Sequence, residues 1–177
     1  MANGREIMGF AAIALELPGH TGQAQRLAGD LAKRFPRDTI VQSEYLPMIP
    51  SAAALWSGKG EKGIEALVPS FPNELGQCNP SFTFSLYPVY LRGEAYLFAK
   101  QGGPAASEFQ KIIDHAGVVG NEPIGALARL GLARAYALSG DQAKAKTAYG
   151  DFFAIWKSAE PGAPLLAKAK VEFAKLP

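Results

Sequence analysis

The chain has few of the residues that build disulfides, metal sites and catalytic centres. Of its 177 residues, one is cysteine and two are histidine. Cys78 has no partner for an internal disulfide, so cysteine usage does not indicate a redox compartment. His20 and His115 have no second ligand at three- or four-residue spacing, which argues against a metal site. No Ser-His-Asp or Cys-His arrangement can be nominated, and we expect no catalytic residue, cofactor or metal.

Charge of one sign and long apolar runs are also scarce. Charged residues make up 19% of the sequence, and the net charge is +2 with both signs scattered. This distribution lacks the clustered basic face of a nucleic-acid binder. The apolar stretch near the N-terminus is interrupted by Glu6 and Glu16, so it is too short for a membrane span and unlike a signal peptide. We therefore expect this chain to bind neither nucleic acid nor membrane.

Hydrophobic residues make up 48% of the sequence, enough for one domain with a sizeable core. The clearest local pattern is LARAYALSGDQAKAKTAYGDFF, residues 132–153. Apolar residues recur there at helical spacing on both sides of Gly140 and Asp141. Glycine suits the left-handed end of one helix, and aspartate can cap the next. The stretch predicts two antiparallel helices joined by a tight turn.

The same pattern occurs 40 residues earlier in the chain. Small residues recur where the two helices of a hairpin would cross closely, and large ones recur where neighbouring hairpins would pack. Two weaker copies surround turns at Gly19 and Gly58. We interpret the pattern as a structural repeat. The matching pairs are Ala133 and Gly93, Tyr136 and Tyr96, Ala145 and Ala105, Tyr149 and Phe109, and Phe152 and Ile112.

These observations predict an all-α fold of four helical hairpins plus a C-terminal capping helix, in a single domain spanning residues 1–177. Because no capping helix precedes residue 5, we expect the chain to be a module of a longer protein. The hairpins are expected at about 5–37, 38–70, 86–118 and 122–158, and the capping helix at 163–176.

Three local features refine this expectation. Pro47 and Pro50 predict that the first helix of the second hairpin is kinked or begins late. Residues 71–88 have no helical period and are expected to form a long loop. The glycine-rich HAGVVGNEPIG lacks the ending and the preceding strand of a phosphate-binding loop. We expect it to be a turn in which Asn121 caps the following helix from Glu122.

The small-x-x-Tyr, turn-glycine, small and aromatic pattern resembles the tetratricopeptide repeat (TPR). It is carried by Ala133, Tyr136, Gly140, Ala145 and Tyr149, whereas the tryptophan usual near the start of that repeat is replaced by Arg129. The resemblance implies an α-α superhelix, or solenoid, whose concave groove binds proteins or peptides. The Lys, Asn and Arg positions that clamp a terminal carboxylate in chaperone-tail TPR domains are largely apolar here, so that ligand is not expected.

In a TPR stack, the first helix of each hairpin lines the concave side. Aromatic residues beside a few charges are typical of peptide-binding hot spots, although packing between hairpins is the alternative for each of them. Tyr90 and Arg134 are the strongest candidates. The predicted groove residues are Tyr45, Trp56, Tyr87, Tyr90, Glu94, Phe98 and Arg134, with Met48, Leu127 and Leu130 at further groove positions.

Three phrases carry a narrower resemblance: LYPVYLRGEAYL, EFQKIIDHAGVVGNEPIGALARLGLARAYALSGD and DFFAIWK. They resemble the C-terminal helical-repeat region of bacterial, eukaryotic-type serine/threonine protein kinases. The chain has no VAIK, HRD or DFG kinase motif, so it is not expected to be an enzyme. The resemblance implies a non-catalytic protein–protein interaction module that regulates a signalling protein or recruits its partners.

Two other functions fit the same pattern. The chain could be a self-association module that makes its parent a homodimer, or a ligand-sensing repeat domain of a transcriptional regulator, since similar arrays follow winged-helix domains. We expect a cytoplasmic location. The alternative is the extracytoplasmic part of a membrane-anchored parent, because such kinases often carry a membrane span before the repeats.

Overall fold

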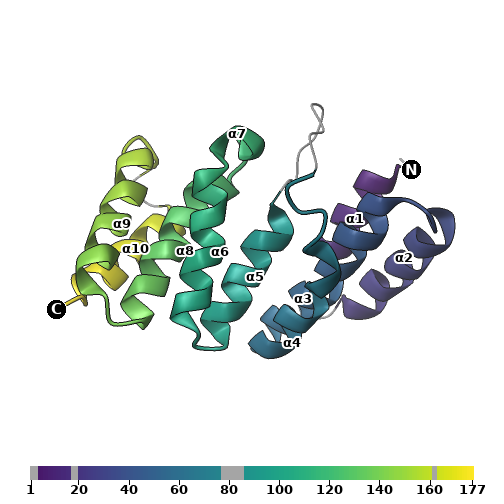
Figure 1. Ribbon diagram of the computed structural model, residues 1–177, viewed down its shortest axis with the longest axis horizontal. Helices are drawn as coiled ribbons and strands as arrows, with labels where there is room; N and C mark the ends of the chain where they lie inside the picture. Colours follow the sequence, from purple (N-terminus) through teal and green to yellow (C-terminus); the bar gives the residue numbers. More distant parts are fainter. Residues whose placement is uncertain (1–3, 17–19, 77–85, 161–162) are drawn as a thin grey trace.

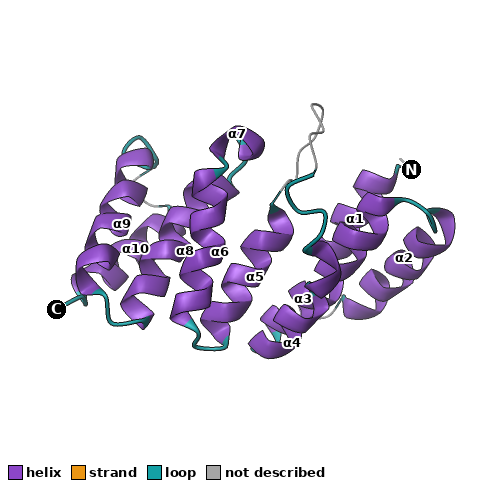
Figure 2. Ribbon diagram, viewed as in Figure 1, coloured by secondary structure: helices purple, strands orange, loops and turns teal. Residues whose placement is uncertain are grey.

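The computed structural model describes residues 4–16, 20–76, 86–160 and 163–177, and every regular element in them is helical (Figure 2). This confirms the all-α prediction for the described residues. The α-helices are α1 (Arg5–Ala14), α2 (Thr21–Arg34), α3 (Leu46–Trp56), α4 (Gly60–Ala66), α5 (Tyr87–Phe98), α6 (Gly102–Asp114), α7 (Ala116–Val119), α8 (Ile124–Leu138), α9 (Gln142–Ile155) and α10 (Pro164–Ala174). Figure 1 shows the pairs of helices following one another in chain order along the long axis, with α10 beside α8 and α9.

The helices pack in pairs that are adjacent in sequence. α1 packs on α2, α3 on α4, α5 on α6, and α8 on α9; successive pairs meet where α4 packs on α5 and α6 on α8. The buried side chains form two clusters, one running from α5 to α10 and one around α1, α2 and α3. Tyr87 packs against both clusters and so lies at their junction.

The turns between paired helices share a left-handed residue. Gly58 between α3 and α4 has φ 67°, and Gly140 between α8 and α9 has φ 81°. Lys100 takes the same place between α5 and α6 with φ 61°, a conformation that costs a residue with a side chain about 1 kcal/mol. The expected cap at Asp141 is confirmed, because its side chain accepts a hydrogen bond from the Lys144 backbone at 3.1 Å. The turn expected at Gly19 lies outside the described residues.

The expected Asn121 cap is wrong. α8 begins at Ile124, its N-cap residue is Pro123, and no side chain caps it. The reason is the proline itself: the residue before proline is disfavoured in helical conformation, so Glu122 cannot open the helix. The expected loop 71–88 is confirmed for residues 71–76, which follow a 3₁₀ turn (Val68–Ser70), but its last two residues, Tyr87 and Pro88, belong to α5. Residues 77–85, with Cys78, lie outside the described ranges.

The prolines of the second hairpin do not delay its first helix. Helical residues begin at Thr39, and a π-helical segment (Val41–Tyr45) leads directly into α3. The wider π turn precedes Pro47, whose ring and missing N–H do not fit a regular α-helical interior. Asp38 begins this helix, since its Oδ1 accepts from the Val41 backbone at 3.1 Å.

Close approach of helices depends on glycine. A Cβ atom added to Gly93 on α5 would lie 2.8 Å from the Phe109 ring, and one added to Gly131 on α8 would lie 2.5 Å from it. The ring therefore fits between two helices because both lack a side chain there. A Cβ on Gly60 would likewise meet Ala95 O at 2.5 Å.

The sequence repeat has a structural counterpart. Gly102 approaches Ala135 O just as Gly60 approaches Ala95 O, so the contact recurs in the next pair of helices. Both members of each matching pair also have the same burial: Tyr96 and Tyr136 are half-buried, and the rest are buried. The paired positions are therefore packing positions. The buried ones are Gly93, Ala133, Ala105, Ala145, Phe109, Tyr149, Ile112 and Phe152.

Replacing Gly131 with alanine tests this packing. Alanine favours a helix by about 1 kcal/mol over glycine, but here its methyl group would displace the Phe109 ring, at a cost of about 1–3 kcal/mol. We expect a net loss of stability in urea unfolding. Gly150→Ala is the matched control, because nothing lies within 4 Å of its Cβ position and the substitution should stabilise α9. Equal effects of the two variants would contradict the packing role of Gly131.

Glu44 makes the stability depend on pH. Its side chain is 3% exposed, and burial raises its pKa from 4.5 to about 7. The folded chain therefore binds more protons than the unfolded chain between these values, and the free energy of unfolding should fall as pH rises through this window. The loss at pH 8 is up to about 3 kcal/mol.

Glu44→Gln should remove this pH dependence, so the variant should lose less melting temperature than the parent chain between pH 5 and pH 8. The measurement is thermal unfolding across that range. Glu65→Gln, at an exposed carboxylate on α4, is the control and should follow the parent chain. A Glu44→Gln variant that loses stability with pH in parallel with the parent would refute the assignment.

Candidate functional site

An apolar groove lies between α3 and α5, the first helices of the second and third predicted hairpins. It has a volume of about 310 Å³. We call it the α3–α5 groove, and it contains four of the predicted groove residues. Ala52, Leu55 and Trp56 line it from α3, and Tyr90, Leu91, Glu94 and Phe98 line it from α5.

Two large aromatic side chains of this groove are open to solvent. Trp56 is 60% exposed and Phe98 is 49% exposed. Both lie in the last turn of their helix, just before the tight turn that leads to the next one. Single exposed apolar residues are common on protein surfaces, but two that share one hollow with further apolar residues form a patch that a partner can cover.

Glu94 is the single charged residue in the lining of the α3–α5 groove. Its Oε1 atom is buried and has no hydrogen-bond partner among the described residues. Burial raises the pKa of this carboxyl, while the positive charge of Arg134 and a hydrogen bond with the Tyr90 side chain act in the opposite direction. A buried acceptor without a donor carries a desolvation cost, so this oxygen is a place where a ligand can be stabilised.

Arg134 is engaged within the chain. Its Nε donates to Glu172 Oε2 at 2.8 Å and its second nitrogen to Glu172 Oε1 at 3.1 Å, a two-point pair that joins α8 to α10. The Tyr149 hydroxyl also donates to Glu172 Oε2, at 3.1 Å. Glu94 on α5, Arg134 on α8 and Glu172 on α10 thus act on one another, and Arg134 holds the last helix in place.

Like Arg134, two further predicted residues are not part of the groove lining. Tyr45 is 3% exposed and packs edge-on against Phe10, with ring centroids 5.4 Å apart, so it is a core residue inaccessible to a partner. The Tyr87 hydroxyl donates to Glu122 Oε2 at 3.2 Å, and burial, with the Glu122 charge, raises its pKa to about 12. At the further groove positions, Met48 and Leu130 are buried in the core.

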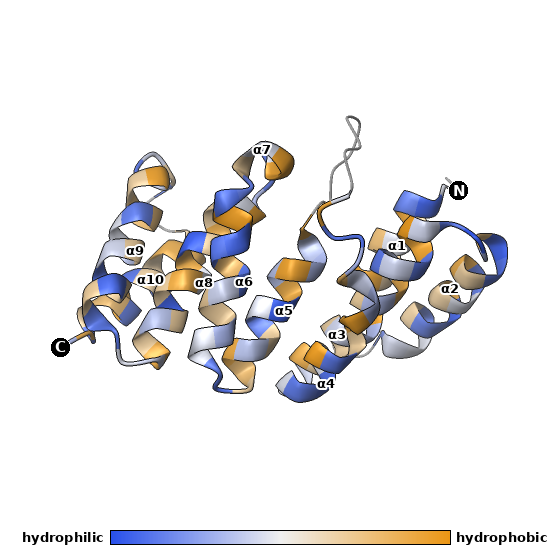
Figure 3. Ribbon diagram, viewed as in Figure 1, coloured by the Kyte–Doolittle hydropathy of each residue, from blue (hydrophilic) through white to orange (hydrophobic). Residues whose placement is uncertain are grey.

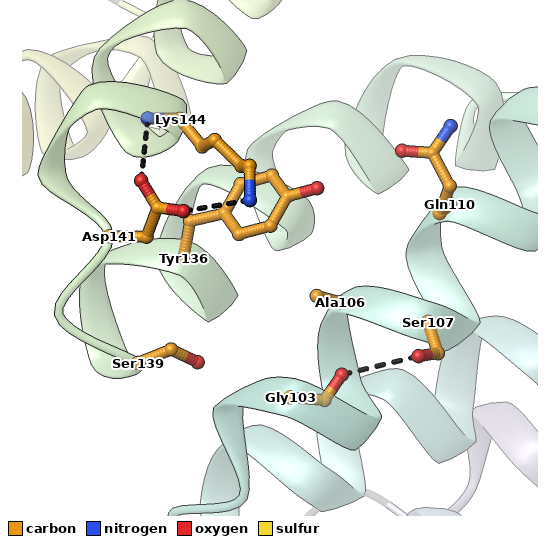
Figure 4. Close-up of a pocket in the computed structure, with 8 residues that line it drawn as sticks. All are labelled: Gly103, Ala106, Ser107, Gln110, Tyr136, Ser139, Asp141 and Lys144. Atoms are coloured by element: carbon orange, nitrogen blue, oxygen red, sulfur yellow. Dashed lines mark hydrogen bonds and ion pairs between the residues drawn. The ribbon is translucent and has the colours of Figure 1, made fainter.

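A second hollow, of about 480 Å³, lies between α6 and the α8–α9 turn (Figure 4). Several of its polar groups are already engaged within the chain. Lys144 lies over the Tyr136 ring, 5.4 Å from its centroid, and its Nζ is 2.9 Å from Asp141 Oδ2. Ser107 donates to Gly103 O at 3.4 Å. This hollow therefore has fewer free polar groups for a ligand than its size suggests, and the α3–α5 groove is the better candidate site.

Sequence reasoning missed a buried ionic cluster on α5 and α6. Arg92 is fully buried, and one of its nitrogens donates to Glu74 at 2.8 Å and to Glu108 at 2.5 Å. Lys111 adds an ion pair with Glu74 at 2.6 Å, and Phe71 stacks over the guanidinium at 4.0 Å. The cluster fixes residues 71–76 against the helices. In the sequence, the three-residue spacing of Glu108 and Lys111 is the only signal of this cluster. Glu74 lies in a segment without helical periodicity, so its position could not be predicted.

Comparison of the chain with protein-family models, with curated proteins and with solved structures finds no match. Within the described ranges, hydrophilic and hydrophobic residues alternate along the helices (Figure 3), and no helix there is both long and apolar enough to cross a membrane. The same residues include no group of three His, Cys, Asp or Glu side chains placed to hold a metal ion.

Proposed function

We propose that this chain is a non-catalytic protein–protein interaction module, a TPR-like superhelix that binds a peptide segment of a partner in the α3–α5 groove. The observation that carries the proposal is the exposure of Trp56 and Phe98 in one apolar hollow, beside an acid whose buried oxygen lacks a partner. Large aromatic side chains around a few polar groups are the usual composition of a binding hot spot.

The recurring packing supports the superhelix. Gly60 lies close to the carbonyl oxygen of Ala95, and Gly102 lies close to that of Ala135. The two carbonyl groups are 40 residues apart in the sequence. The α4–α5 and α6–α8 junctions therefore share an equivalent contact, as the junctions of stacked repeats do. A stack of this kind places α3, α5 and α8 side by side, which is how residues from different hairpins come to line one groove.

The resemblance to the repeat region of bacterial serine/threonine kinases suggests the setting. In this proposal the module belongs to a signalling protein and recruits a substrate or regulator to it. Homodimerisation of the parent is the competing use of the same surface. Light scattering at high protein concentration separates the two, because a monomeric chain removes the self-association alternative.

The proposal is tested with peptides selected from a random display library on the whole chain. Trp56→Ala combined with Phe98→Ala should weaken their binding at least about tenfold in calorimetry, since truncating hot-spot residues typically costs about 2 kcal/mol or more. Ile7→Ala is the matched control, because Ile7 is an exposed apolar residue on α1, outside the groove. Unchanged affinity of the double variant, with its helical circular dichroism intact, would refute the groove as the binding site.

A further inference from the structure

We infer that the segment bound in the α3–α5 groove presents a basic side chain, lysine or arginine, next to an apolar residue. The cation pairs with Oε1 of Glu94, and the apolar residue covers Trp56 and Phe98. This inference rests on the proposed function of the groove and specifies the chemistry of its partner.

The first argument is that Oε1 of Glu94 has no hydrogen-bond donor among the described residues, although Tyr90 and the charge of Arg134 act on the same carboxyl. Arg134 occupies the position equivalent to Glu94 in the next repeat, 40 residues further on, and both donors described for Arg134 are bonded to Glu172. Lys168 acts on Glu94 only as a distant charge and is itself exposed on α10. No ion pair of Glu94 occurs among the described residues, so a partner's cation would supply what this carboxylate lacks.

The second argument is the sign of the groove. Among its lining residues one is charged, and that residue is acidic. An acidic ligand would be repelled by Glu94 and would find no cation there, whereas a basic one gains an ion pair in surroundings where apolar walls strengthen electrostatic attraction. The open faces of aromatic rings attract cations as well, and Trp56 and Tyr90 border the same hollow.

The third argument is the mixed character of lysine and arginine. Both side chains carry a charged end on an apolar stem, and the stem can lie along hydrophobic surface while the charge reaches a polar group. In the α3–α5 groove the exposed apolar groups, Trp56 and Phe98, share one hollow with Glu94. In a segment with a basic residue next to an apolar one, the apolar residue can therefore cover the aromatic rings while the basic residue reaches the carboxylate.

The probes are three pools of short fluorescein-labelled peptides with a fixed central Leu-Z-Phe, where Z is arginine, its uncharged isostere citrulline, or glutamate. Binding to the whole chain is measured by fluorescence anisotropy. We expect the arginine pool to bind about tenfold more tightly than the citrulline pool, and the glutamate pool to bind most weakly. Glu94→Gln should bring the arginine and citrulline pools to the same affinity, whereas Glu65→Gln, at an exposed acid on α4, should keep them apart.

A second measurement needs no variant and so does not depend on the folding of Glu94→Gln. Because an ion pair is screened by salt, binding of the arginine pool to the parent chain should weaken as salt is raised, with little change for citrulline. Equal salt responses would overturn the inference.

The remaining outcomes separate this inference from the proposed function. Equal affinity of the arginine and citrulline pools, both weakened by Trp56→Ala with Phe98→Ala, overturns the basic partner and keeps the groove. Tightest binding of the glutamate pool also overturns it. A dimer in light scattering that the same double variant dissociates assigns the groove to a second copy of the chain. Absence of binding by all three pools, together with unchanged display-selected binding in the double variant, overturns both.

Discussion

The structure depends on the close approach of helices at positions that have no side chain. The Phe109 ring fits between Gly93 and Gly131, and the same device recurs in the N-terminal half, where a Cβ on Gly9 would lie 2.7 Å from the Tyr45 ring. Dispersion contacts fall off steeply with distance, so this close fit stabilises helices that have few long-range partners. Each helix pair then holds the next, from α1 to α10 (Figure 1).

The α3–α5 groove follows from the same packing. α4 contacts the backbone of α5 through Gly60, and this draws the α3–α4 pair against α5. Trp56 and Phe98 are left at the rim, while Tyr90 packs inward, with its ring centroid 5.9 Å from that of Phe109. The groove is thus the part of these helices that their own neighbours do not cover.

The charges have two separate roles. Arg92 and its glutamates are enclosed and mutually paired, and they fasten residues 71–76 to α5 and α6. Glu94 lies on the same helix as Arg92, yet its Oε1 atom is without a donor among the described residues. The Arg92 pairs run through one guanidinium nitrogen, and Nε and the other Nη of Arg92 have no partner among the described residues. These pairs fix a local arrangement, whereas the Glu94 oxygen would be stabilised by any donor that reaches it.

Helical periodicity, turn glycines and the repeat were sufficient to predict helices in pairs, because these signals are local: Gly140 and Asp141 act within one turn of the chain. The resemblance to the tetratricopeptide repeat nominated Trp56, Tyr90, Glu94 and Phe98, which line one groove from α3 and α5. Burial of Tyr45, the bond of Arg134 to Glu172 and the cluster around Arg92 were decided by tertiary structure. Each of these depends on a partner far away in sequence, and periodicity within one helix contains no information about which distant residue will lie against it.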